Sequence, residues 1–93
     1  MSGDIITRDL LIVNQRGLHA RASAKFVQVA SRFDAEVQVE KDGVTVGGTS
    51  IMGLMMLAAS PGCHIRVSAS GAEAALAMDA LQALIADRFG EEA

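Results

Sequence analysis

A histidine and an arginine stand two residues apart in the segment RGLHAR, residues Arg16–Arg21. An apolar stretch precedes this segment and helix-forming residues follow it, so we expect His19 at the start of a helix. Backbone N–H groups at a helix start have no partner within the helix, and the helix dipole is positive there. A neutral imidazole in such a place is a nucleophile at an anion-binding site. The pattern indicates a histidine that carries a phosphoryl group, rather than a metal ligand or an ordinary surface histidine.

The composition indicates one small domain with an aliphatic core. The chain has 93 residues, 51% of them hydrophobic, and three phenylalanines are its only aromatic residues. Because Cys63 is the single cysteine, no intrachain disulfide can form, and no Cys/His cluster has zinc-ligand spacing. We expect a single domain over residues 1–93, with its core at about 6–89, that binds no metal and no cofactor.

Charge and hydropathy disfavour two classes of protein. The net charge is −3, whereas nucleic-acid-binding domains usually carry basic patches and stacking aromatic residues. The N-terminus lacks the apolar stretch of a signal peptide, and the longest apolar run, Ile51–Ala59, is too short to cross a bilayer. We expect a cytoplasmic monomer with no nucleic-acid partner and no membrane insertion.

The first half of the chain has the hydrophobic periodicity of a strand, a helix and a hairpin. Leu10–Val13 is predicted to be a strand, and Ala35–Lys41 alternates in the manner of another. Asp42-Gly43 favours a type I′ turn, which pairs Lys41 with Val44 and Val39 with Val46. Between the strands, residues 20–33 are predicted to form a helix with one apolar stripe: Ala22, Phe26, Ala30 and Phe33.

The second half adds a short helix, a strand and a longer helix. Ser50 is suited to cap a helix from Ile51 to about Leu57, and Ser60–Gly62 forms a turn. A strand follows, with Ile65, Val67 and Ala69 on its inner face. Ser70–Glu73 has the pattern of a capping box, and residues 90–93 look frayed. The last helix runs to about Phe89 with these residues inward: Ala74, Ala77, Leu81, Leu84 and Ile85.

The predicted order is therefore βαββαβα. Helices with one apolar face cover one face of a sheet whose strands alternate apolar and polar residues. We expect an α+β fold, a two-layer open-faced sandwich in which three helices lie on one face of a four-stranded antiparallel sheet.

Two motifs in this order connect the chain with a known family. The first is GLHAR at Gly17–Arg21 and the second is SIMGLM at Ser50–Met55. From about Ile6 to Phe89 the chain resembles the histidine-containing phosphocarrier (HPr/NPr) family of the bacterial phosphoenolpyruvate-dependent phosphotransferase system. The resemblance implies that Nδ1 of His19 takes a phosphoryl group from Enzyme I and yields it to an Enzyme IIA-type protein. It implies a carrier that works only with partner enzymes and is not an enzyme by itself.

The neighbours of His19 fit the same chemistry. The planar fork of Arg21 suits bidentate contact with phosphate and matches the family's active-site arginine, although a solvated helix residue is the alternative. The free N–H groups of Ala20, Arg21 and Ala22 can donate to phosphoryl oxygens. Gly17 gives the loop backbone freedom, and Lys25 is interpreted as a general surface charge.

The chain departs from the family's usual pattern at Ala22, where HPr proteins have proline directly after the arginine. Alanine restores a backbone N–H that proline lacks and keeps helix propensity. Our hypothesis is that this N–H is offered to the phosphoryl group or to the ring of His19.

The second motif has a structural and a functional interpretation. Ser50 is a good helix N-cap, and it also matches the serine that an HPr kinase/phosphorylase modifies in some bacteria. Ile51, Met52 and Met55 match the family's partner-docking patch, to which exposed methionines are well suited. The structural alternative places two of these four side chains in the core: Ile51, Met52, Met55 and Met56.

Three functional alternatives follow. The first is phosphotransfer toward sugar transport. The second is a nitrogen-related regulatory branch that signals by phosphorylation-dependent docking without sugar transport. The third, a small nucleic-acid-binding domain, is disfavoured by the charge and by the lack of stacking aromatics.

His64 and Cys63 are interpreted as structural residues.

Overall fold

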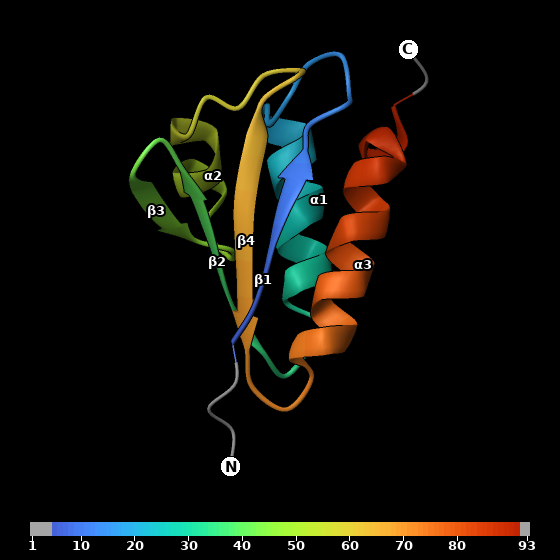
Figure 1. Ribbon diagram of the computed structural model, residues 1–93. Coiled ribbons are helices and arrows are strands. Elements are labelled where there is room, and N and C mark those ends of the chain that lie inside the picture. The colour runs from blue at the N-terminus through green and yellow to red at the C-terminus, as the bar shows by residue number, and fades with distance from the viewer. Residues whose placement is uncertain (1–4, 92–93) are drawn as a thin grey trace.

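The computed structural model describes residues 5–91 and has the predicted order of elements (Figure 1). The strands are β1 (Ile5–Leu11), β2 (Glu36–Lys41), β3 (Val44–Gly47) and β4 (His64–Ser70). The helices are α1 (Ala20–Ala30), α2 (Ile51–Met56) and α3 (Ala74–Ala86), and the 3₁₀ turn η1 (Arg88–Gly90) follows α3.

The four strands form one antiparallel sheet in the order β1-β4-β2-β3. Helices α1 and α3 pack against each other, and α1 also packs against α2. Figure 1 shows this layer of helices on one face of the sheet, while the other face is open. The predicted open-faced α+β sandwich is confirmed.

The core lies between the two layers and is almost entirely aliphatic. The inward residues of β2 and β4 are buried, while the residues between them are exposed or half-buried. The stripe of α1 and the inner residues of α3 close the core from the other side. Phe26 is among the largest fully buried side chains, and burying such a side chain contributes about 1.5–3 kcal/mol. The packing thus fixes which face of α1 points inward.

The β2–β3 hairpin has the predicted register, with Lys41 opposite Val44 and Val39 opposite Val46. Asp42 has a φ of 53° and Gly43 a φ of 82°. Both turn residues therefore lie in the left-handed region that a type I′ turn requires.

The predicted boundaries differ from the structure at several element ends. β1 begins at Ile5 and ends at Leu11, so it starts well before the predicted strand. The N–H of Ile12 still donates to the Cys63 carbonyl at 2.9 Å, which continues the contact of this strand with the β4 side. Helix α1 ends at Ala30 rather than at Phe33, and α3 ends at Ala86.

The predicted capping box at the start of α3 is wrong. Ser70 is the last residue of β4 and lies opposite Ile5 and Glu36 in the sheet. The N-cap of α3 is Glu73, whose carboxylate accepts the N–H of Asp34 at 2.7 Å. The acidic side chain therefore ties the helix start to the loop before β2 and does not reach back to a serine.

Candidate functional site

His19 lies at the N-terminal end of α1, as its sequence position predicted. It is the N-cap residue, with an extended backbone (φ −74°, ψ −178°), and its carbonyl accepts the Ser23 N–H at 2.8 Å. Its side chain makes no capping hydrogen bond. The N–H groups of Ala20, Arg21 and Ala22 precede this first helical bond, so the helix itself gives them no acceptor. The ring therefore stands beside three backbone donors.

The loop that holds His19 is tied to the segment after α2. The N–H of Leu18 donates to the Ala59 carbonyl at 2.9 Å, and the Ser23 hydroxyl donates to the Leu18 carbonyl at 3.2 Å. Figure 1 shows the loop before α1 and the loop after α2 at the same end of the molecule, where η1 also lies. Three segments that are distant in sequence thus meet around His19.

The ring of His19 is held by a carboxylate from the C-terminal segment. Nε2 of His19 lies 2.7 Å from Oε2 of Glu91. Nδ2 of Asn14 donates to the same oxygen at 2.9 Å and to the Gly17 carbonyl at 2.8 Å. Asn14 is fully buried, so these bonds connect the loop, the ring and the tail from inside the site.

This contact determines which ring nitrogen can act as a nucleophile. The hydrogen bond from His19 lowers the pKa of the Glu91 carboxyl; burial opposes this shift, and the hydrogen bond from Asn14 adds to it. An ionised carboxylate only accepts hydrogen bonds, so Nε2 must be the protonated nitrogen. In the neutral ring Nδ1 then carries the lone pair, and within residues 5–91 no group hydrogen-bonds to it.

Arg21 is exposed on the first turn of α1. In the part of the chain that the structure describes, its guanidinium makes no hydrogen bond or ion pair. Ala22, the position where the family has proline, is buried and belongs to the apolar stripe of the helix.

Ser50 has the predicted capping role. Its hydroxyl accepts the Gly53 N–H at 2.9 Å as the N-cap of α2. A Cβ added to Gly53 would lie 3.0 Å from that hydroxyl oxygen and 3.0 Å from Cβ of Val46, so the space at this position is tight.

The four apolar residues of α2 that the sequence left undecided all lie at the surface. Met52 and Met56 are 72% and 75% exposed, and Ile51 and Met55 are exposed as well. Leu54 and Leu57 fill the core positions. The alternative in which two of the four belong to the core is therefore wrong. We call these four residues the α2 patch.

Three residues of the site escaped the sequence analysis. Asn14 is the first residue of the polar, turn-prone run Asn14–Gly17, so nothing in the sequence marked its amide as buried. Residues 90 and 91, which looked frayed, are ordered by a turn in which the Glu91 N–H donates to the Arg88 carbonyl at 2.9 Å. Lys25 is more than a surface charge, because its Nζ donates to the Phe89 carbonyl at 2.7 Å. Residues 92 and 93 lie outside the described part.

Other polar features do not add to the site. Cys63 is half-buried, and a hydrogen bond with Ser60 lowers the pKa of its thiol. His64 is exposed at the start of β4. Within residues 5–91 no group of three or more His, Cys, Asp or Glu side chains could hold a metal ion. In the same range no helix is long and apolar enough to span a membrane.

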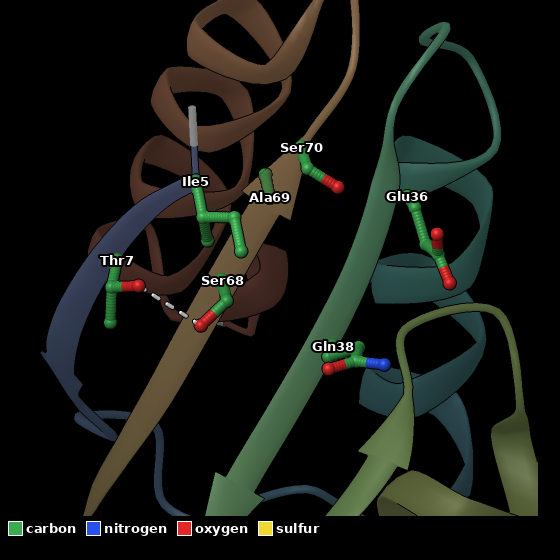
Figure 2. Close-up of a pocket in the computed structure, with 7 residues that line it drawn as sticks. All are labelled: Ile5, Thr7, Glu36, Gln38, Ser68, Ala69 and Ser70. Atoms are coloured by element: carbon green, nitrogen blue, oxygen red, sulfur yellow. Dashed lines mark hydrogen bonds between the residues drawn. The ribbon is translucent and has the colours of Figure 1, made fainter. Parts of the chain in front are cut away.

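A hollow lies on the open face of the sheet (Figure 2). It is lined by residues from the first half of β1, from β2 and from the end of β4, with a hydrogen bond of 3.1 Å between Thr7 and Ser68. His19 follows the opposite end of β1. The hollow therefore cannot supply a substrate pocket for this histidine.

The family follows from comparison of the whole chain with known proteins. The family model described as "PTS HPr component phosphorylation site" matches residues 6–87. The chain belongs to the HPr family. The family resemblance inferred from the two motifs is thereby confirmed, and it extends over residues 6–87.

Named HPr proteins are similar over nearly their full length. The Phosphocarrier protein HPr of Cupriavidus necator is 49% identical over 87 residues, which are 94% of this chain and 98% of that protein. The Phosphocarrier protein HPr of Neisseria meningitidis serogroup A is 52% identical over 87 residues, again 94% of this chain and 98% of that protein. The crystal structure of HPr-C-His from Thermoanaerobacter tengcongensis matches with a TM-score of 0.90 at 44% identity, covering 95% of this chain and 99% of that one. The chain is thus an HPr-type phosphocarrier of the phosphotransferase system.

Proposed function

We propose that Nδ1 of His19 is the atom that carries the phosphoryl group, taken from Enzyme I and passed to an Enzyme IIA-type protein. The contact between Nε2 and Glu91 carries this proposal, because it leaves Nδ1 as the free nucleophile beside the open N-terminus of α1. Family membership supports the same assignment.

The surroundings of Nδ1 suit a dianionic group. The N–H groups of Ala20, Arg21 and Ala22 can donate to its oxygens, and the positive end of the helix dipole favours the charge. The exposed guanidinium of Arg21 can offer two parallel hydrogen bonds from a flexible side chain. The carrier then needs no pocket of its own, because a docked partner encloses His19 and excludes water.

The α2 patch is the proposed docking surface. Its methionines are flexible and exposed, so they can adapt to partners of different shape. The bond between Leu18 and Ala59 fixes the end of α2 relative to the His19 loop. A protein that docks on Ile51, Met52 and Met55 therefore approaches the phosphoryl group in one orientation.

Ser50 is the proposed regulatory position, modified by an HPr kinase/phosphorylase. Its hydroxyl is exposed, and a phosphate there could still accept the Gly53 N–H at the helix N-terminus. The added negative charge would stand at the edge of the α2 patch. It would weaken docking of an acidic partner without unfolding the helix.

Incubation with phosphoenolpyruvate and Enzyme I, followed by ³¹P NMR, tests the carrier function. We expect an acid-labile phosphoramidate at Nδ1 of the wild-type chain and none in His19→Ala, while His64→Ala, at an exposed histidine on β4, serves as the matched control. Arg21→Lys should slow the transfer but still allow phosphorylation. A wild-type chain without phosphoramidate would contradict the proposal.

A further inference from the structure

We infer that Lys25 and Glu91 are positioning residues for His19: Lys25 fastens the C-terminal turn, and Glu91 at the end of that turn fixes the protonation of the ring. This inference rests on the proposed function and adds the residues that prepare the nucleophile. Neither residue belongs to the GLHAR or SIMGLM motif.

The turn that precedes Glu91 has a backbone conformation that is stable only with contacts from outside the turn. Arg88 and Phe89 have φ values of 57° and 55°, and Gly90 follows with 78°. Two successive non-glycine residues in the left-handed region are unfavourable unless the surroundings determine them. Such a turn should not persist on local interactions alone.

Two contacts supply this support, and both come from the body of the protein. The side chain of Phe89 is 1% exposed and belongs to the core. Lys25 Nζ donates to the Phe89 carbonyl at 2.7 Å, a charge-assisted bond to a backbone carbonyl of the turn itself. Lys25 stands on the same helix that begins at His19. Lys25, which holds the turn, and His19, which the turn positions, therefore belong to the same helix and its N-cap.

The buried amide of Asn14 shows that the position of Glu91 is specified and not incidental. Both bonds of its NH₂ group are made, to Glu91 and to the Gly17 carbonyl. Among the described residues its Oδ1 is buried without a partner, which is costly for an amide oxygen. The reverse orientation of the amide would direct this oxygen at two acceptors. Asn14 thus keeps its donors on the Glu91 carboxylate at the expense of its own acceptor.

The carboxylate has a defined role at each step of phosphoryl transfer. Before transfer it accepts the Nε2 proton, so Nδ1 holds the lone pair. In the transfer, this lone pair forms the bond to phosphorus, and the bond to the phosphorylated donor protein breaks with its electron pair returning to the donor. The proton stays on Nε2, so the ring becomes a cation that faces Glu91.

The release step uses the same arrangement in reverse. A nucleophile of the acceptor protein attacks phosphorus, and the electron pair of the N–P bond returns to Nδ1. The ring is again neutral with its proton on Nε2. Glu91 therefore stabilises the charged ring with no proton exchange with solvent in either direction.

The test compares ring protonation with transfer in the full chain. The variants are Glu91→Gln and Lys25→Met, with Lys25→Arg as the conservative rescue and Lys41→Met as a matched control on the β2–β3 hairpin. ¹⁵N NMR of the unphosphorylated chain, at a pH where the ring is neutral, reports the tautomer without any partner. ³¹P NMR with Enzyme I then reports the rate of phosphorylation.

We expect the wild-type ring to be protonated almost entirely on Nε2. Glu91→Gln should populate the Nδ1–H tautomer and slow phosphorylation about tenfold or more, by analogy with other carboxylates that orient a functional histidine. Lys25→Met should shift the tautomer in the same direction, and Lys25→Arg should restore it. An unchanged tautomer in Glu91→Gln would overturn the inference even if the wild type is phosphorylated normally. A shifted tautomer supports the positioning role even if the wild type accepts no phosphoryl group, so the two proposals can fail separately.

Discussion

Gly17 and Ala59 are in direct backbone contact. A Cβ added to Gly17 would lie 2.2 Å from the Ala59 carbonyl oxygen, and Gly17 has a φ of +64°. The same carbonyl accepts the Leu18 N–H at 2.9 Å. Glycine is therefore required for two reasons, and the resulting contact joins the His19 loop to the segment after α2. The contact between Gly17 and Ala59 therefore fixes the position of His19, the proposed phosphoryl carrier, relative to the α2 patch.

Substitution of Gly17 should be more damaging than substitution of other glycines with positive φ. Gly17→Ala combines a left-handed alanine, which costs about 1–2 kcal/mol, with a clash against backbone that cannot rotate away. Gly43→Ala is the matched control, because its φ is +82° and no heavy atom lies within 4 Å of the added Cβ. We expect the larger loss of unfolding free energy in urea for Gly17→Ala. Equal losses in the two variants would contradict the close contact.

The cap at Ser50 can be separated from its proposed regulation. Ser50→Ala should lower the free energy of unfolding by about 1 kcal/mol, because the Gly53 N–H loses its acceptor. Ser50→Asp should keep most of this stability, since aspartate is also a good N-cap. Thermal and urea unfolding measure both, with Thr49→Ala as an exposed neighbour outside the cap. A stable Ser50→Asp variant that is nevertheless a poorer substrate of Enzyme I would support regulation through charge.

The α2 patch should matter for partners and not for folding. Met52→Glu and Met56→Glu change highly exposed side chains, so each should alter stability by less than about 0.5 kcal/mol. Each should raise the KM of Enzyme I for the chain, because docking loses apolar contact. Leu76→Glu on α3 is the matched control, an exposed apolar residue on another helix. If Leu76→Glu raised KM as much as the methionine variants, the docking surface would be wrongly placed.

The contact between His19 and Glu91 should make stability depend on acid pH. The hydrogen bond from His19 lowers the pKa of the Glu91 carboxyl below its ordinary value of 4.5. A carboxyl with a lowered folded-state pKa stabilises the fold fully above its unfolded value and loses this contribution as the pH falls through the folded one. Unfolding curves of the wild type and Glu91→Gln should therefore converge as the pH drops below about 4.5. Glu36→Gln, on the open face of the sheet, controls for the loss of one carboxylate.

Most of the fold could be predicted because local signals agreed with one another. The turn Asp42-Gly43 and the alternating valines specify the same hairpin register, and the structure has it. The capping box at Ser70 failed because a local pattern competed with strand pairing. Ser70 pairs with Glu36 in the sheet, and the Glu73 carboxylate accepts a hydrogen bond from the N–H of Asp34, a residue distant in sequence.

The site was only half predictable for a related reason. His19, Arg21 and Ser50 are adjacent to element starts, so their positions follow from local rules. Asn14, Lys25 and Glu91 act through contacts across 64 to 77 positions of sequence. The sequence contains no local pattern for such contacts, and a C-terminal Gly-Glu stretch is typical of a frayed end. The return of the tail to the histidine is visible only in the structure, where Phe89 is buried in the core and Glu91 contacts His19.

Ala22 offers a test of what the departure from the family's proline does. Its N–H belongs to the first turn of α1, where the helix provides no acceptor, so proline would remove no helical hydrogen bond. Ala22→Pro should therefore fold, with the proline ring at this buried position on the stripe that Ala22 shares with Phe26. What it should lose is one donor to the phosphoryl group on His19. A hydrogen bond to a charged group contributes about 1.5–3 kcal/mol, so we expect hydrolysis of the phosphohistidine to accelerate by roughly ten- to a hundredfold. Ala22→Ser retains the N–H at similar size and should hydrolyse at the wild-type rate. The decay of the ³¹P signal after removal of Enzyme I measures the hydrolysis rate in the wild type, Ala22→Pro and Ala22→Ser. Equal decay in the wild type and Ala22→Pro would show that the Ala22 N–H does not contact the phosphoryl group.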